Sequence, residues 1–139
     1  MTSTQRVTNG LGYAGLVPFI VPAALIVAGS EHGAFLFNFT GTYALGIICF
    51  LTGSWWGIAL APGLRSALLL SNLYFLIAFF IFLFANQVWP IAAAVLLMGI
   101  YLAEQHSSLF SEFPETYRKM RTVLTLIASV SMLAIHIAG

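Results

Sequence analysis

Charged residues are scarce in this sequence of 139 residues: Asp, Glu, Lys and Arg make up 6% of it, whereas 60% is hydrophobic. A soluble domain carries about 25% charged residues, so this chain has too few to cover a surface in water. The excess apolar surface must therefore face lipid. The net charge of +1 also excludes the broad positive field that attracts nucleic acid, so we expect no nucleic-acid partner.

Cysteine is nearly absent, with Cys49 alone. A disulfide within the chain is thus excluded, and so is a metal or iron–sulfur site built from several cysteines. The sequence also has no phosphate-binding loop, no Ser–His–Asp order and no haem-binding motif. We therefore predict no cofactor and no metal. A metal site formed by Glu31, His32 and His136 on the outer face stays open as an alternative, because these are suitable ligand types.

Long apolar runs are abundant, and five are long enough to cross a bilayer. They cover about residues 11–29, 43–60, 67–84, 88–103 and 122–137. The sequence therefore predicts one all-α integral-membrane domain over residues 1–139, a polytopic helical bundle of about five transmembrane helices. Pro18 and Pro22 in the first run argue against a cleavable secretory signal. They predict a kink whose freed carbonyls bond to neighbouring helices, and whether this kink is a moving hinge stays open.

The connections between the spans have different characters. Residues 30–42 contain alternating phenylalanines, which predict a segment at the membrane surface. Within residues 104–121, Pro114 can open a helix. The apolar stripe of that helix consists of Phe113, Tyr117, Met120 and Leu124. This pattern predicts a short amphipathic cytoplasmic helix that lies on the membrane and leads into the fifth span.

The basic residues give the expected orientation, because all of them fall in segments that share one side of the membrane. They are Arg6, Arg65, Arg118, Lys119 and Arg121. By the positive-inside rule this side is the cytoplasm, or the matrix of a mitochondrion. We therefore expect a multi-pass protein of the bacterial inner (plasma) membrane, with its N-terminus in the cytoplasm and its C-terminus outside.

One face of the second span is lined by glycine. Gly46, Gly53 and Gly57 recur at spacings of seven and four, and such small residues let helix backbones approach closely. We predict that this face packs against another helix, within a homo-oligomer or with another membrane-protein subunit. Trp55 and Trp56 lie near the inner end of the same span, at the depth expected of an aromatic belt.

Ionisable residues are missing from the depth of every predicted span, which argues against an ion-coupled transporter or a voltage sensor but not against a passive pore. They gather on the inner side instead. The residues of this group are Arg65, Glu104, His106, Arg118, Lys119 and Arg121. We interpret the group as an interfacial ion-pair cluster, with a site for an anionic or quinone headgroup as the alternative. Ser71 and Asn72 are embedded in the third span, where they predict hydrogen bonds between helices or, alternatively, a ligand site.

Three stretches together carry a family resemblance: Leu11–Phe19, Phe50–Gly57 and Tyr117–Arg121. In this order and spacing they resemble a family of small bacterial inner-membrane proteins of unknown function, which also includes a mitochondrial transmembrane protein. The resemblance covers nearly the whole chain and implies five spans but no activity. Members often have histidine or another polar residue where Trp55 stands. Because this chain departs from them at that position, we expect no polar role for Trp55.

The functional prediction follows from the glycine face and the missing catalytic groups. We expect a non-catalytic accessory, assembly or scaffold protein that is surrounded by membrane lipids and binds other membrane helices or itself. The alternative is a protein that binds or transports a lipid-like or neutral small molecule, such as a phospholipid or a quinone. A membrane enzyme that uses Glu104 and His106 is a third hypothesis.

Overall fold

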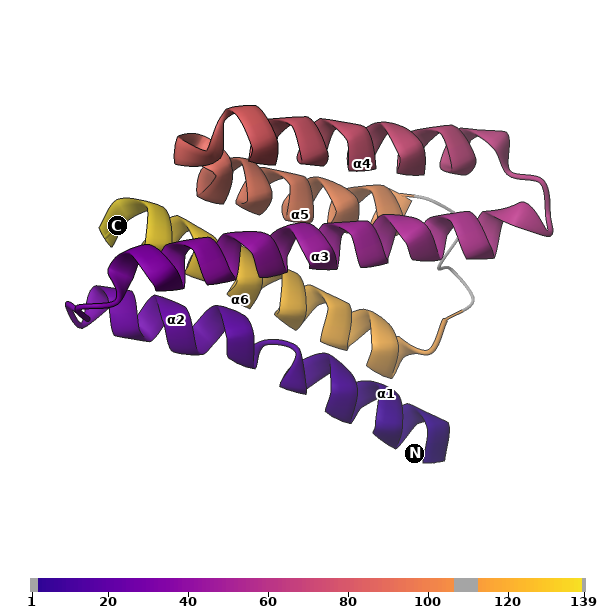
Figure 1. Ribbon diagram of the computed structural model, residues 1–139. Coiled ribbons are helices and arrows are strands. Elements are labelled where there is room, and N and C mark those ends of the chain that lie inside the picture. The colour runs from indigo at the N-terminus through magenta and orange to yellow at the C-terminus, as the bar shows by residue number, and fades with distance from the viewer. Residues whose placement is uncertain (1–2, 107–112, 139) are drawn as a thin grey trace.

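The computed structural model describes residues 3–106 and 113–138, and every element within these residues is helical (Figure 1). The elements are α1 (Ser3–Ala14), α2 (Val17–Val27), α3 (Gly33–Leu60), α4 (Arg65–Phe84), the 3-10 turn η1 (Asn86–Val88), α5 (Trp89–His106) and α6 (Glu115–Ala138). Five helical segments are long and apolar enough to cross a membrane, with α1 and α2 together forming the first. The predicted all-α bundle of five spans is confirmed.

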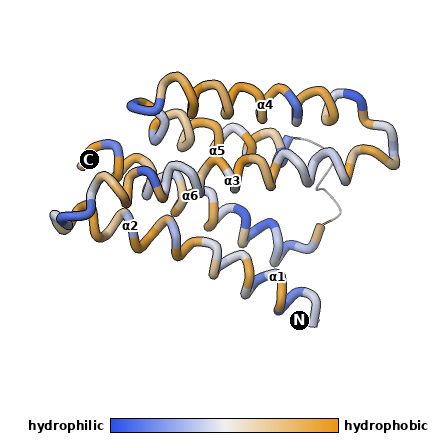
Figure 2. Tube along the Cα trace, viewed as in Figure 1, coloured by the Kyte–Doolittle hydropathy of each residue, from blue (hydrophilic) through white to orange (hydrophobic). Residues whose placement is uncertain are grey.

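The two ends of the bundle differ in composition. One end, called the basic end below, holds the start of α1, the turn between α3 and α4, the end of α5 and the start of α6 (Figure 1). The far end holds the connection between α2 and α3, the turn η1 and the end of α6. Figure 2 shows that hydrophilic residues lie mainly near the ends of the helices, while apolar residues fill their middles.

The first span breaks at Gly15 and Leu16, one turn before Pro18. Pro18 has no N–H for the carbonyl four residues earlier, and its ring pushes on that turn. The Leu16 and Phe19 amides therefore bond to carbonyls three residues back, at 3.1 and 2.9 Å. The Gly15 carbonyl instead accepts a 2.8 Å hydrogen bond from the hydroxyl of Tyr43 on α3. A neighbouring helix thus satisfies a freed carbonyl, as the sequence predicted.

The second span starts earlier than expected, because α3 is 28 residues long and begins at Gly33. Residues 33–42, which belong to the segment expected at the membrane surface, are therefore helical and continuous with the second span. No proline interrupts this stretch, and its apolar residues suit a helix in lipid as well as an alternating pattern does. Gly41 also lies buried against Trp89 of α5, whose indole N–H donates a 2.8 Å hydrogen bond to the Gly41 carbonyl.

The fifth span also differs from its prediction. The expected short amphipathic helix is the first two turns of α6, which runs unbroken from Glu115 to Ala138. Met120 of the apolar stripe is buried in the bundle, so this part of the stripe packs against protein. Residues 107–112 of the predicted inner loop lie outside the described residues.

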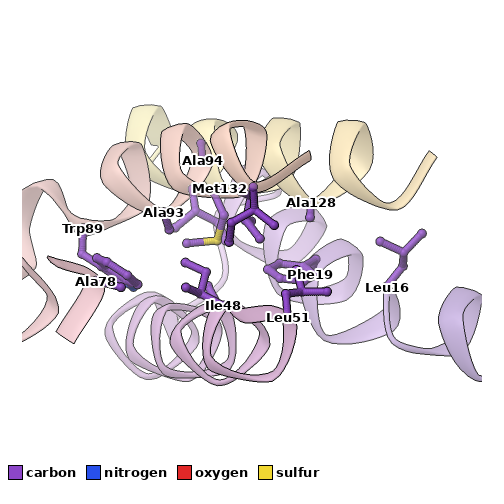
Figure 3. Packing of buried hydrophobic residues seen from close by; sticks show 14 of the residues in the cluster. Leu16, Phe19, Ile48, Leu51, Ala78, Trp89, Ala93, Ala94, Ala128 and Met132 are labelled. Carbon is purple, nitrogen blue, oxygen red and sulfur yellow. The ribbon is translucent and has the colours of Figure 1, made fainter. Parts of the chain in front are cut away.

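The core lies between α2, α3, α5 and α6. Figure 3 shows Phe19 against Leu51 and Met132 reaching toward Ile48, with alanines on the facing helices. The core alanines include Ala44, Ala93, Ala94 and Ala128. Such small side chains let helices approach closely in a membrane, where dispersion contacts and hydrogen bonds hold them together. Helix α4 packs mainly on α3 and exposes several phenylalanines, so much of its surface faces lipid.

A buried ion pair beside an open cavity

The central feature of the basic end is an ion pair between Glu104 of α5 and Arg121 of α6. The Arg121 Nη2 and Nε atoms donate to Glu104 Oε1, at 2.8 and 3.1 Å. Both residues are buried, with exposed fractions of 5% for Glu104 and 6% for Arg121. A charge at this depth requires a partner, because lipid and protein solvate it far less well than water does.

The second oxygen of the carboxylate is bound by a third helix. The indole N–H of Trp55 on α3 donates a 3.0 Å hydrogen bond to Glu104 Oε2. Trp55 is 1% exposed, and its ring packs edge-on against Tyr74 of α4 with the centroids 5.8 Å apart. The Tyr74 hydroxyl lies so close to Gly99 of α5 that a methyl group there would overlap it. The carboxylate therefore joins α3, α5 and α6 directly, and the aromatic pair connects it to α4.

The chain places these groups together because α5 and α6 are antiparallel neighbours. Glu104 lies in the last turn of α5, and Arg121 lies in the second turn of α6, so their side chains meet at the same depth. The hydroxyls of Tyr101 and Thr122, 2.7 Å apart, join the same two helices close to the pair. Replacing one partner would leave the other charged and buried, which costs about 3–5 kcal/mol for such pairs.

Of the predicted ion-pair cluster, the structure pairs Glu104 with Arg121. Glu104 and Arg121 are buried, whereas the other members of the group are exposed: Arg65, His106, Arg118 and Lys119. Of the two neighbouring tryptophans of α3, Trp56 is exposed and Trp55 is buried. The expectation that Trp55 has no polar role is wrong, because its N–H donates to the carboxylate. The sequence carried a signal for the ion pair. The fourth and fifth spans are consecutive and antiparallel, and the ends that their loop connects carry opposite charges.

An open cavity of about 460 Å³ lies beside this ion pair, between the first span, α3 and α6. Its wall is mostly apolar, with Leu16, Phe19, Leu51 and Leu124 among the lining residues. Arg121, Tyr117 and Thr125 of α6 supply polar groups, and α1 contributes Gly12 and Gly15. The volume falls within the range of about 300–1,000 Å³ that is typical of small-molecule sites. The cavity is therefore large enough for a small molecule, and its wall is apolar apart from a few polar residues that include Arg121.

The glycine face of α3 lies on the surface of the bundle. Gly46, Gly53 and Gly57 are all exposed, and a methyl group added to any of them would meet no atom within 4 Å. No other described helix of this chain therefore occupies the face. A shallow apolar groove beside Gly46, near the far end, is lined by Phe35 and Phe39 as well. The predicted close packing of these glycines does not occur within the chain.

The remaining predicted sites carry no comparable arrangement. Ser71 and Asn72 both donate to the Leu68 carbonyl of their own helix, at 2.8 and 2.9 Å, rather than to a neighbouring helix. Among the described residues, no three side chains of His, Cys, Asp or Glu lie close enough to hold a metal ion. The alternative metal site at Glu31, His32 and His136 is therefore not formed.

The fold and this site define a polytopic helical membrane protein with an ion pair buried in its bundle. The chain belongs to the family described as "Protein of unknown function (DUF3429)", which matches residues 4–137. It is similar to Transmembrane protein 69 of Xenopus tropicalis, with 30% identity over 129 residues. The match covers 88% of this chain and 50% of that protein, so the chain spans about half the length of this curated relative. No solved structure matches. The predicted family resemblance is confirmed.

The ion pair is tested by a double-mutant cycle. We expect Glu104→Gln and Arg121→Met each to lower the free energy of unfolding by about 3 kcal/mol, because each leaves a buried group unpaired. The loss of unfolding free energy in the double variant should be smaller than the sum of the two single losses by at least about 2 kcal/mol. Unfolding in detergent measures these changes. Arg118→Met, an exposed control on the same helix, should change stability by less than about 0.5 kcal/mol. Strictly additive losses would show that the two side chains do not interact.

Proposed function

We propose that this protein is a non-catalytic accessory or assembly module that associates with another membrane helix through the glycine face of α3. The observation that supports this proposal is the exposure of Gly46, Gly53 and Gly57 with open space above each. Glycine weakens a helix relative to alanine by about 1 kcal/mol, so three exposed glycines on one face suggest a use outside the chain. That use is close packing against a helix of a second copy or of another subunit.

The glycine face permits a clean test because the space above it is empty within the chain. Gly53→Leu with Gly57→Leu should leave the thermal stability of the monomer nearly unchanged. It should raise the dissociation constant for association at least tenfold, because the bulky side chains hold the helices apart. Native mass spectrometry after mild extraction measures both the partner and the loss.

The matched control for this experiment is Ala24→Leu, which adds similar bulk at an exposed position of α2. It should leave association intact. If the glycine double variant associates as well as the wild-type protein, the glycine face is not the contact.

We further propose that the protein lies in a bacterial inner membrane with its basic end in the cytoplasm. The support is the distribution of charge, since Arg6, Arg65, Arg118 and Lys119 are all exposed or half-buried at that end. The positive-inside rule retains such residues on the cytoplasmic side.

Reporter fusions test this orientation. Alkaline phosphatase folds only outside the cytoplasm, so its fusion after Gly139 should be active, and its fusion after residue 64 should be inactive. The reverse pattern would place the basic end outside. A fusion of green fluorescent protein at each position provides the complementary control.

A second candidate function is the binding of a lipid-like small molecule in the cavity, and the observation that favours it is the cavity itself. Its apolar wall ends beside a buried arginine, which matches an amphiphile with a polar head. The exposed Arg65, Arg118 and Lys119 could also contact anionic headgroups of the surrounding lipid, with His106 and Glu104 at the same end.

Filling the cavity tests the second candidate. Leu124→Phe adds bulk to a lining residue and should reduce the amount of amphiphile that copurifies with the protein at least tenfold. Native mass spectrometry measures the retained adduct. Leu126→Phe is the matched control, because Leu126 is exposed on the same helix. Equal retention in both variants would exclude the cavity as the binding site.

A further inference from the structure

The polar end of the cavity combines free donors with no net charge. Arg121 carries five N–H donors, and its recorded hydrogen bonds to Glu104 come from Nε and Nη2. Within residues 3–106 and 113–138, Nη1 makes no hydrogen bond. Among the described residues, the one buried side-chain N or O atom without a partner is Thr40 Oγ1. Arg121 Nη1 is therefore not sealed in the protein, which agrees with the place of Arg121 in the cavity wall.

Two hydroxyls lie on the same face of α6 as Arg121. Tyr117 and Thr125 stand four residues before and after it, and both line the cavity. No hydrogen bond is recorded for either hydroxyl within the described residues. The guanidinium of Arg121 can only donate hydrogen bonds, so a ligand group that binds at Nη1 must be an acceptor, and Tyr117 and Thr125 are the hydroxyl-bearing residues of the same cavity wall.

The charge of that ligand follows from the ion pair. Glu104 already neutralises Arg121 at 2.8 Å, so the site attracts an anion weakly. A carboxylate or phosphate bound at Nη1 would bring a second negative charge beside Glu104 in a medium of low dielectric constant, where like charges repel strongly. A neutral carbonyl incurs no such repulsion and still accepts an N–H bond.

From these contacts we propose that the cavity binds a neutral amphiphile that carries a carbonyl group, with the carbonyl at Arg121 Nη1 and the apolar part along the wall formed by Leu16, Phe19 and Leu51. The carbonyl of an isoprenoid quinone and the ester of an acylglycerol share this chemistry. The proposal rests on the second candidate function and adds the class of the headgroup to it. Glu104 acts here as a positioning residue that sets the charge preference of the site.

The test compares three probes with ten-carbon chains on the purified full chain: decylubiquinone, monodecanoylglycerol and decanoate. Binding constants are measured by titration in one detergent at pH 8, where decanoate is charged. We expect at least one neutral probe to bind at least tenfold more tightly than decanoate. The tighter of the two neutral probes identifies the source of the carbonyl. Tighter binding of decanoate by the wild-type protein would overturn the proposal.

Two variants separate the headgroup inference from the cavity function. Glu104→Gln removes the neutralising charge. The affinity for decanoate should therefore rise at least tenfold relative to the affinity for the neutral probes. An unchanged preference in the folded variant would overturn the role of Glu104. Leu124→Phe should weaken the binding of all probes, while the exposed control Leu126→Phe should leave their binding unchanged. Binding that survives Leu124→Phe, or no binding of any probe, would overturn the second candidate function together with the inference. The wild-type comparison decides the headgroup class even where Glu104→Gln yields little folded protein.

Discussion

The arrangement of the basic end depends on the need to neutralise one carboxylate inside a membrane bundle. One carboxylate oxygen of Glu104 accepts hydrogen bonds from Arg121, and the other accepts one from Trp55. The three helices must therefore meet at a fixed depth and rotation. Packing of alanines and isoleucines alone would tolerate sliding by a turn, because apolar surfaces interact with little direction. A buried charge does not tolerate it, since any shift leaves the charge without its partner. The polar contacts therefore fix the register of the helices, and the apolar packing holds them together.

The tight packing of the core contrasts with two open features of the surface. The groove beside Gly46 and the cavity beside Arg121 both border α3, and Tyr43 and Ile47 line both of them. A contact on the glycine face would thus change the surroundings of the helix that also forms one wall of the cavity. The two candidate functions therefore concern neighbouring surfaces of one helix.

The number and type of spans could be predicted from the sequence because apolar runs of about 20 residues have few alternatives in a bilayer. The start of α3 could not, since Phe35, Phe37 and Phe39 suit both an alternating surface segment and a helix. The pairing of Glu104 with Arg121 required knowing that their helices are neighbours and that both continue past the apolar runs. The binding of Trp55 to Glu104 joins residues 49 positions apart, and no local pattern reveals such a contact.

The length of α3 has a consequence for the surrounding bilayer. Its 28 residues span about 42 Å at 1.5 Å per residue, whereas the 20 residues of α4 span about 30 Å, the thickness of a typical hydrocarbon core. The longer helix must incline, project from the core or thicken the lipid around it, and each response has a cost that depends on bilayer thickness. The exposed Phe35 and Phe39 continue the glycine face toward the far end, so the additional length of α3 belongs to that face. In a bilayer of typical thickness, α3 is therefore longer than the hydrocarbon core and α4 matches it.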